Sequence, residues 1–301
     1  MRRFVFTPFG SRVPTADGTT VISCDGLVEA ADLHLSHWDG NRTPLEWKRD
    51  TSTESALDYA ESRRSPDGES KSSAAELVTN NHFDADGALS IFALIDPDTA
   101  LAHRALLVAA AEAGDFDAWP SNPRGLELEA SIRAIAGPSE DEDAYERVLG
   151  SLGSIVTNLE ARDDLWGEEW EALHREEELA ARTLAVSRHG SITLFEGSFE
   201  PRGPILDKRA SRDSTRWLTA IDRGHGRFDY RYERPRWAWA DTVDRPKVGA
   251  PVRGPIVDAL GKSFSAKAAS GMTAILGTME PVSLSPRELV SRLLEADAGA
   301  R

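Results

Sequence analysis

The stretch from Val78 to Ile95 constrains the fold of this chain more than any other. It predicts a short strand, a polar turn and then a helix. The apolar run from Ala88 to Ile95 is dense enough for a helix that is buried on most sides. A strand followed at once by a buried helix is typical of α/β sheets, which bind ligands at the edge where their strands end.

The turn of this stretch carries a candidate metal site. His82, Asp84 and Asp86 occupy alternate positions, so an extended backbone directs all three side chains to one side. Gly87 follows, and a glycine can take backbone angles that other residues avoid. Imidazole and carboxylate ligands without thiolates suit manganese or magnesium.

Two simpler interpretations compete with a metal site. The first is an ordinary turn, because Asp and Gly are common turn residues, and this alternative stays open. The second is a calcium loop of the EF-hand type, which closes with a bidentate Glu. The closing position here is Ala93, inside the apolar run, so the calcium loop is excluded.

Composition bounds the class of protein. A chain of 301 residues is long enough for two domains. Its content of 40% hydrophobic and 28% charged residues is typical of a globular protein. The net charge of −15 argues against a broad nucleic-acid or membrane surface. No apolar run is long enough to span a bilayer and no signal-like start is present, so we expect a cytoplasmic protein. The single cysteine, Cys24, excludes an internal disulfide and predicts a buried packing residue.

Two earlier segments also bring polar residues to strand ends. The β-branched run from Thr19 to Gly26 predicts a strand that stops at Asp25. The segment from Ala31 to Trp38 alternates and predicts a second strand with His34 on its polar face. His37 faces the other way unless this strand has ended or bulged. Ordinary core or surface histidines remain the alternative.

A polar turn and a helix follow. Arg42 and Thr43 lie in the turn, and Asp50 fits the N-cap of a helix that continues through Tyr59. Free backbone amides at a helix start bind phosphate, so Arg42 and Thr43 are candidate phosphate contacts. A plain helix cap is the simpler role.

The turn after Val78 resembles the first motif of the DHH-family phosphoesterases, which is a strand, Asp-x-Asp-Gly and a small-residue helix. The match comprises His82, Asp84, Asp86 and Gly87, with Ser90 in the opening turn of the helix. The resemblance implies that these positions bind divalent manganese or magnesium. It therefore implies a two-metal hydrolase.

The earlier segments resemble the other half of the DHH pattern. The counterparts are Asp25, the Ser36-His37-Trp38 position and the helix start from Asp50 to Glu54. The Asp-His-His triplet of the family is not intact, and these segments precede the Asp-x-Asp-Gly strand instead of following it. A circular permutation explains this order, with the polar linker 62–75 where a natural chain end would lie. The chain also resembles a bacterial family with no assigned function.

Helices dominate the middle of the chain. The pattern predicts them at Ala100 to Ala113, capped by Asp98 or Thr99 and stopped by Gly114, and at Leu126 to Ala136, Asp141 to Leu159 and Glu168 to Ala185. The acidic turn after Gly114 contains Asp115 and Asp117. A solvated helix end is the favoured role for both, and a ligand role is the alternative.

Strand-like alternation begins at about residue 186. Three segments, Ser191 to Phe195, Arg227 to Tyr232 and Trp237 to Ala240, predict a smaller β-containing domain, and Ser285 to Ala296 predicts a closing amphipathic helix. Interleaved Arg and aromatic residues either grip phosphates or form cross-strand pairs. His225, between two glycines, is similar to the glycine-rich His motif of the second DHH domain, which implies a substrate contact.

The sequence therefore predicts an α/β protein. Its first domain, residues 1–185, is a mostly parallel sheet flanked by helices with a permuted DHH-like order, and residues 186–301 form a smaller α+β domain. We expect catalytic roles for Asp84, Asp86 and His37, metal ligation by His82, Asp84, Asp86, Asp25 and His34, and substrate binding by Arg42, Thr43 and His225.

The expected function is a metal-dependent phosphoesterase that uses Mn²⁺ or Mg²⁺. Its substrate would be a small phosphorylated compound or a short oligonucleotide. The alternative is a non-catalytic metal- or nucleotide-binding regulatory protein on a degenerate DHH-like fold. The oligomeric state and the identity of the substrate are not determined by the sequence.

Overall fold

The computed structural model describes residues 2–14, 16, 18–64, 75–249, 263–266 and 276–298. They belong to two compact units: unit 1 comprises Met1–Glu171 and Ala240–Pro246, and unit 2 comprises Ala172–Trp239 and Lys247–Arg301. The sequence patterns instead suggest a boundary at residue 185. Residues 65–74 of the predicted linker lie outside the described residues.

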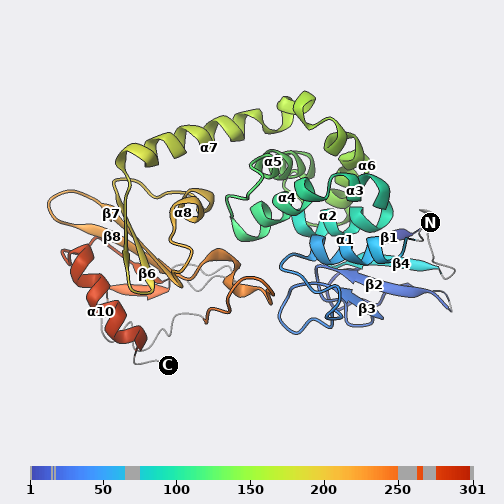
Figure 1. Ribbon diagram of the computed structural model, residues 1–301, viewed down its shortest axis with the longest axis horizontal. Helices are drawn as coiled ribbons and strands as arrows, with labels where there is room; N and C mark the ends of the chain where they lie inside the picture. Colours follow the sequence, from blue (N-terminus) through green and yellow to red (C-terminus); the bar gives the residue numbers. More distant parts are fainter. Residues whose placement is uncertain are drawn as a thin grey trace. The chain divides into compact units, whose positions relative to one another are not determined.

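Unit 1 contains a parallel sheet of four strands. Their order is β1 (Arg3–Phe6), β4 (Glu76–Asn80), β2 (Thr20–Cys24) and β3 (Leu33–Leu35), and every neighbouring pair is parallel (Figure 1). The predicted α/β class is confirmed. All four strands end at the same edge because they run in the same direction. The loops after β1, β2, β3 and β4 therefore meet there.

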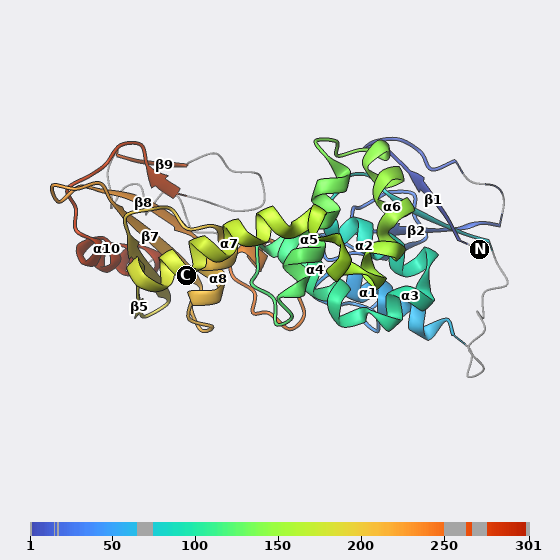
Figure 2. The ribbon, with the colours of Figure 1, turned by 90° about the horizontal axis from the view of Figure 1, so that it is seen from above.

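Helices cover this sheet, with α1 and α2 packed together next to the strands (Figures 1 and 2). The helices of unit 1 are α1 (Ser52–Ser62), α2 (Ala85–Ile95), α3 (Pro97–Ala102), α4 (Arg104–Phe116), α5 (Arg124–Ala136), α6 (Glu142–Thr157), the 3₁₀ turn η1 (Leu159–Arg162) and the start of α7 (Asp163–Thr183). Every residue of α2 except Ile95 is buried, as its apolar run predicts. Cys24 is also buried, as expected.

Several predicted helix ends are wrong. Asp96 caps α3, with Pro97 at the first helical position, in place of Asp98 or Thr99. The predicted single helix breaks at His103, and α4 then continues through Gly114 to Phe116. A glycine inside a helix is tolerated where no room exists for a side chain, and a Cβ on Gly114 would meet Ala85 at 2.9 Å.

The start of α1 also differs from the prediction. Thr51, not Asp50, is the N-cap, and it forms a capping box in which its side chain accepts from the Glu54 amide and the Glu54 side chain accepts from the Thr51 amide. The carboxylate of Asp50 is thereby released for contacts described below.

Unit 2 contains a mixed sheet of six strands. Their order is β5 (Ala185–His189), β6 (Ile192–Gly197), β7 (Arg216–Asp222), β8 (Phe228–Glu233), β10 (Leu276–Thr278) and β9 (Phe264–Ala266). Only β6 and β7 are parallel, with α8 (Gly203–Arg209) in the connection between them. The helix α10 (Pro286–Ala298) packs against β6 (Figure 1).

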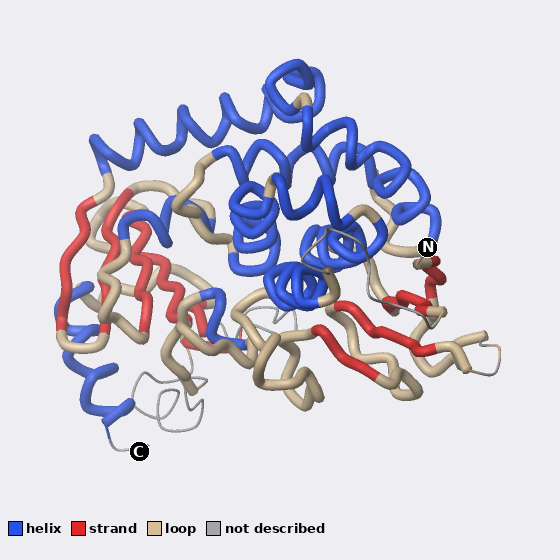
Figure 3. The backbone as a smooth tube through the Cα atoms, turned by 45° about the vertical axis from the view of Figure 1, so that its right-hand side comes forward, coloured by secondary structure: helices blue, strands red, loops and turns tan. Residues whose placement is uncertain are grey.

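One predicted strand of unit 2 is wrong. Trp237 to Ala240 alternates in sequence, but Arg236–Trp239 form the 3₁₀ turn η2. Figure 3 shows the helices of the chain in blue and its strands in red. None of the helices in the described part of the chain combines the length and the apolarity that crossing a membrane requires.

The polar turn after β4 is held by buried hydrogen bonds. The Tyr145 hydroxyl of α6 donates to the carbonyl of His82 at 2.8 Å and accepts from Nδ2 of the Asn80 side chain at 2.8 Å. Gly87 lies against the same groups, because a Cβ there would meet Asn80 Nδ2 at 2.6 Å and the Tyr145 oxygen at 2.7 Å. The glycine of the Asp-Gly pair is therefore required by close packing.

We predict that Gly87→Ala lowers the free energy of unfolding by about 1–3 kcal/mol, because the added methyl group overpacks a buried site. Gly150→Ala in α6 is the matched control, since a Cβ there meets nothing within 4 Å. The control should be neutral or stabilising by up to about 1 kcal/mol. Urea unfolding followed by circular dichroism measures both, and equal effects of the two substitutions would contradict the packing argument.

Candidate metal centre

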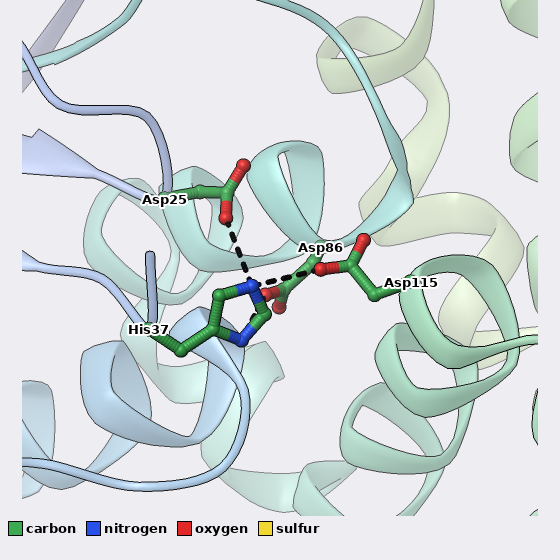
Figure 4. A group of neighbouring side chains, drawn as sticks. All are labelled: Asp25, His37, Asp86 and Asp115. Carbon is green, nitrogen blue, oxygen red and sulfur yellow. Dashed lines mark ion pairs between the residues drawn. The ribbon is translucent and has the colours of Figure 1, made fainter. Parts of the chain in front are cut away.

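Four acidic and imidazole side chains from remote parts of the chain meet in unit 1. Asp25 follows β2, His37 follows β3, Asp86 lies in the first turn of α2 and Asp115 in the last turn of α4. Figure 4 shows the three carboxylates gathered around the imidazole. One ligand atom from each of the four residues lies within 4.8 Å of those of the other three. The cluster is a candidate site for one cation.

Asp25 is held in an unusual backbone conformation. Its φ of 60° lies in the left-handed region, and Gly26 follows it in a position where a Cβ would clash with Asn80 and Asn81. The carboxylate is fully buried, and its Oδ1 accepts from Ser52 Oγ at 2.9 Å. Packing of the loop after β2 against the loop after β4 therefore directs the Asp25 carboxylate toward His37 and the other members of the cluster.

A backbone carbonyl orients the ring of His37. The Nδ1–H of His37 donates to the Asp50 carbonyl at 2.8 Å, which directs Nε2 toward the carboxylates. Nε2 lies 2.9 Å from Asp115 Oδ2 and 3.6 Å from Asp25 Oδ1. The predicted strand ends at Leu35, so His37 is free of the strand alternation that would turn it away.

The start of α1 holds Asp86. Its two carboxylate oxygens accept from the backbone amides of Ser52 and Thr53, each at 2.7 Å. These amides belong to the unsatisfied donors at a helix N-terminus, where a negative charge is stabilised. The result is a buried carboxylate with a fixed orientation, 3.7 Å from His37 Nδ1.

The sequence interpretation of Asp115 is wrong. A solvated helix end is predicted, whereas the side chain is only 5% exposed and contacts His37. A signal for this position exists in the sequence: Asp115 continues the buried row of Leu107 and Ala111 at intervals of four residues on α4. An acidic residue on a buried helix face requires a partner.

A second group shares Asp25 with the first. It contains Asp25, His82 and Asp84, whose ligand atoms also lie within 4.8 Å of one another. His82 Nε2 lies 2.9 Å from Asp25 Oδ2 and 2.9 Å from Asp84 Oδ2. The side chains of His82 and Asp84 are 28% and 34% exposed, so this group is accessible from solvent.

The predicted alternation of His82, Asp84 and Asp86 on one extended segment is therefore wrong. Asp84 is the N-cap of α2, with Oδ1 accepting from the Gly87 amide at 2.7 Å, and Asp86 lies inside the helix. The helix turn sends Asp86 toward His37 and leaves Asp84 with His82. The structure thus distributes the three residues over two groups.

The charges in the cluster shift the pKa of several members. Burial lowers the pKa of His82 and of His37, but the neighbouring carboxylates outweigh it and raise them to about 11 and about 10. Burial raises the pKa of Asp86 to about 6 and raises that of Asp115 well above its usual range. For Asp25 the contacts with His82 outweigh burial, and its pKa is lowered. The carboxylates therefore favour positive charge beside them, which either a protonated imidazole or a bound cation supplies.

Two buried carboxylate oxygens of the cluster each face an imidazole nitrogen. They are Asp25 Oδ2 and Asp115 Oδ2, both inaccessible to water. Asp25 Oδ2 is 2.9 Å from His82 Nε2, which it shares with Asp84, and Asp115 Oδ2 is 2.9 Å from His37 Nε2. Buried carboxylate oxygens are normally bonded to donors or to metal ions.

The other predicted site residues have different contacts. His34 lies beside Arg42, with Nδ1 accepting from the Arg42 amide at 3.3 Å and Nε2 lying 3.1 Å from the Arg42 guanidinium. His34 belongs to neither of the two groups that the described residues form. Thr43 Oγ1 donates to the Ser36 carbonyl at 2.8 Å. His225 is in the turn between β7 and β8 of unit 2, with φ of 53°.

Residues 2–268 match one protein family, described as a family of unknown function (DUF6687). The chain belongs to this family. No curated protein matches the sequence. The DUF6687 match includes every member of the two acidic groups and also the segment Ala240–Pro246, which returns to unit 1.

This DUF6687 segment forms hydrogen bonds with the His37 backbone and with Asp50. The amide of Asp241 donates to the His37 carbonyl at 2.6 Å, and the amide of Asp244 donates to Asp50 Oδ1 at 2.8 Å. Arg245 donates to Asp50 Oδ2 at 2.9 Å, and its guanidinium lies over the Phe116 ring, 4.8 Å from the centroid. Asp50 is thus fixed on both sides, through its side chain to Arg245 and through its carbonyl to His37.

We predict that Arg245→Met lowers the free energy of unfolding by about 2 kcal/mol, because it leaves the buried Asp50 carboxylate without its cation. Arg188→Met is the control: Arg188 pairs with Asp213 at 2.9 Å, and both side chains are at least half exposed. Exposed pairs contribute at most about 1 kcal/mol. Chemical unfolding measures both variants, and a loss at Arg245 no larger than at Arg188 would show that the contact of Arg245 with Asp50 contributes nothing.

Proposed function

We propose that this protein is a metal-dependent phosphoesterase that hydrolyses a phosphate ester or phosphodiester with two divalent cations. One observation supports this above all others: Asp25 belongs to two adjacent groups of acidic and imidazole ligands. A carboxylate with one oxygen toward each group is the arrangement that a bridged pair of metal ions requires.

The donor atoms fit such ions. The first ion would be held by Asp25, His37, Asp86 and Asp115, and the second by Asp25, His82 and Asp84. All are carboxylate oxygens or imidazole nitrogens, which suit Mn²⁺ or Mg²⁺. The buried oxygens on Asp25 and Asp115, each 2.9 Å from an imidazole nitrogen of the same ligand set, favour a bound cation further.

The residues around the ligands have complementary tasks. When bound, the two ions would activate a water molecule and stabilise negative charge on the phosphoryl oxygens. The Asp50 carbonyl orients His37, and the amides of Ser52 and Thr53 orient Asp86. The exposed edge formed by His82 and Asp84 is where a substrate can approach.

The proposal extends to a permuted DHH-like fold. It is supported by the meeting of Asp25, His37 and Asp86 at one edge of a parallel sheet, although their segments come in an order different from that of the family. A sheet edge is assembled in space, so strand order along the chain does not change its chemistry. Trp38 stands where the family has a second His of the triplet, and its ring packs on His82, with centroids 4.9 Å apart.

A non-catalytic metal-binding role is the second candidate. The observation that favours it is the complete burial of His37, Asp25 and Asp86, which would isolate the first ion from substrate. Such an ion would stabilise the fold or a regulatory state. The two candidates share metal binding and differ in hydrolysis.

We predict that the protein binds two Mn²⁺ ions and that single substitutions remove them selectively. Asp115→Asn should abolish the first site and His82→Gln the second, while Asp25→Asn should weaken both, since Asp25 alone belongs to both groups. Isothermal titration calorimetry gives the stoichiometry, with Asp213→Asn as a surface control. Absence of Mn²⁺ and Mg²⁺ binding to the correctly folded protein would refute the metal centre.

We also predict Mn²⁺-dependent hydrolysis of p-nitrophenyl phosphate or its diester by the unmodified protein. Asp25→Asn should lower kcat/KM by about 100-fold or more, as expected for loss of a shared ligand, whereas Asp213→Asn should not. Circular dichroism would verify that the variants fold. Stoichiometric metal binding without hydrolysis of any ester would instead support the regulatory candidate.

A further inference from the structure

A groove adjoins the candidate metal centre in unit 1. It has a volume of about 990 Å³ and lies between the loop after β1 and the loop after β2, with Asn81 after β4 as a further lining residue. The strand order β1-β4-β2 brings these three loops together at one sheet edge. The groove is large enough for a ligand of nucleotide size.

Asn81 connects the groove to the metal ligands. Its Nδ2 donates to the Leu27 carbonyl at 3.1 Å, and its Oδ1 lies 3.0 Å from His82 Nδ1. His82 and Asp84 are the exposed members of the second acidic group. A phosphoryl group bound at that exposed edge would therefore have the rest of its molecule beside Asn81.

The groove has the wrong charge for a chain of inorganic phosphates. The described residues that line it include one cation, Arg12, and one anion, Glu29, and the others are apolar, amide or hydroxyl residues or glycine. Inorganic polyphosphates carry charge on every unit and need several Lys or Arg partners. A balanced, partly apolar lining instead suits an uncharged organic group.

Phe9 indicates the shape of this group. Its side chain lines the groove and is 89% exposed, so the aromatic face is available for stacking. Flat unsaturated rings stack on such faces, and nucleobases do so with little dependence on the base. Arg12 and Asn81 also line the groove and carry hydrogen-bond donors.

We propose that this groove binds the flat, ring-containing organic part of an ester whose phosphoryl group lies at the metal centre. The inference rests on the proposed function and narrows its substrate class to aryl or nucleoside phosphates, excluding inorganic pyrophosphate and polyphosphate.

The test compares substrates on the Mn²⁺-loaded full chain. The ratio of kcat/KM for phenyl phosphate to kcat/KM for methyl phosphate should fall about 5- to 100-fold in Phe9→Ala and be restored in Phe9→Trp. Leu45→Ala is the matched control, since Leu45 is equally exposed at 88% but does not line the groove. An unchanged ratio in Phe9→Ala, or tripolyphosphate as a better substrate than phenyl phosphate, would overturn the inference.

Equilibrium binding separates this inference from the proposed function. AMP binding by calorimetry should weaken about 5- to 100-fold in Phe9→Ala and stay unchanged in Leu45→Ala, whether or not any ester is hydrolysed. If the protein hydrolyses esters but its preference for phenyl over methyl phosphate does not depend on Phe9, the phosphoesterase proposal stands and the proposed role of the groove is rejected. If AMP binding depends on Phe9 but no ester is hydrolysed, the groove binds the ring and the phosphoesterase proposal is rejected. If AMP binding does not depend on Phe9, the proposed role of the groove is rejected whether or not hydrolysis occurs.

Discussion

The buried negative charge around His37 is the constraint on which unit 1 depends. Asp25 and Asp86 are buried, the Asp115 side chain is only 5% exposed, and all three lie within reach of one imidazole. Isolated carboxylates in such surroundings cost several kcal/mol each, so every one of them must have a donor or a cation. The local architecture supplies these partners from helix termini, imidazole rings and, in our proposal, two divalent ions.

Three parts of unit 1 provide the partners, and each has a structural reason. The N-terminus of α1 presents the amides of Ser52 and Thr53 to Asp86, because the capping box at Thr51 starts the helix there. The parallel sheet directs the ends of β2, β3 and β4 to one edge. The segment Ala240–Pro246 closes the far side through Asp50.

The two acidic groups differ in their access to solvent, and in our proposal this difference gives each a distinct chemical task. The group around His37 is enclosed, which favours tight binding of one ion in a fixed geometry. The group containing His82 and Asp84 is partly exposed and lies beside Asn81 and the groove. An enclosed site next to an open one is consistent with both the phosphoesterase and the regulatory candidate. In the phosphoesterase, the ester would bind at the open His82–Asp84 group.

The sequence by itself determined those features that depend on neighbouring residues. The strand before Asn80, the buried helix α2 and the strand ending at Asp25 follow from hydrophobic periodicity and from turn residues, which act over a few positions. The parallel edge that unites Asp25, His37 and Asp86 follows from the α/β pattern. The N-cap Thr51, the helix break at His103 and the 3₁₀ turn η2 are not predicted. Neighbouring residues are often equally good caps, and a short alternating run is compatible with either a strand or a turn.

Only the tertiary structure decided how the site is composed. Asp115 joins it because α4 packs against α2, and Asp84 separates from Asp86 because the helix begins between them. His34 contacts Arg42 because the loop after β3 turns back toward it. Arg245 contacts Asp50 although the two residues are 195 positions apart in the chain. Contacts of this kind depend on which surfaces pack together. Local periodicity can mark a buried position such as Asp115, but it does not identify the partner of that residue.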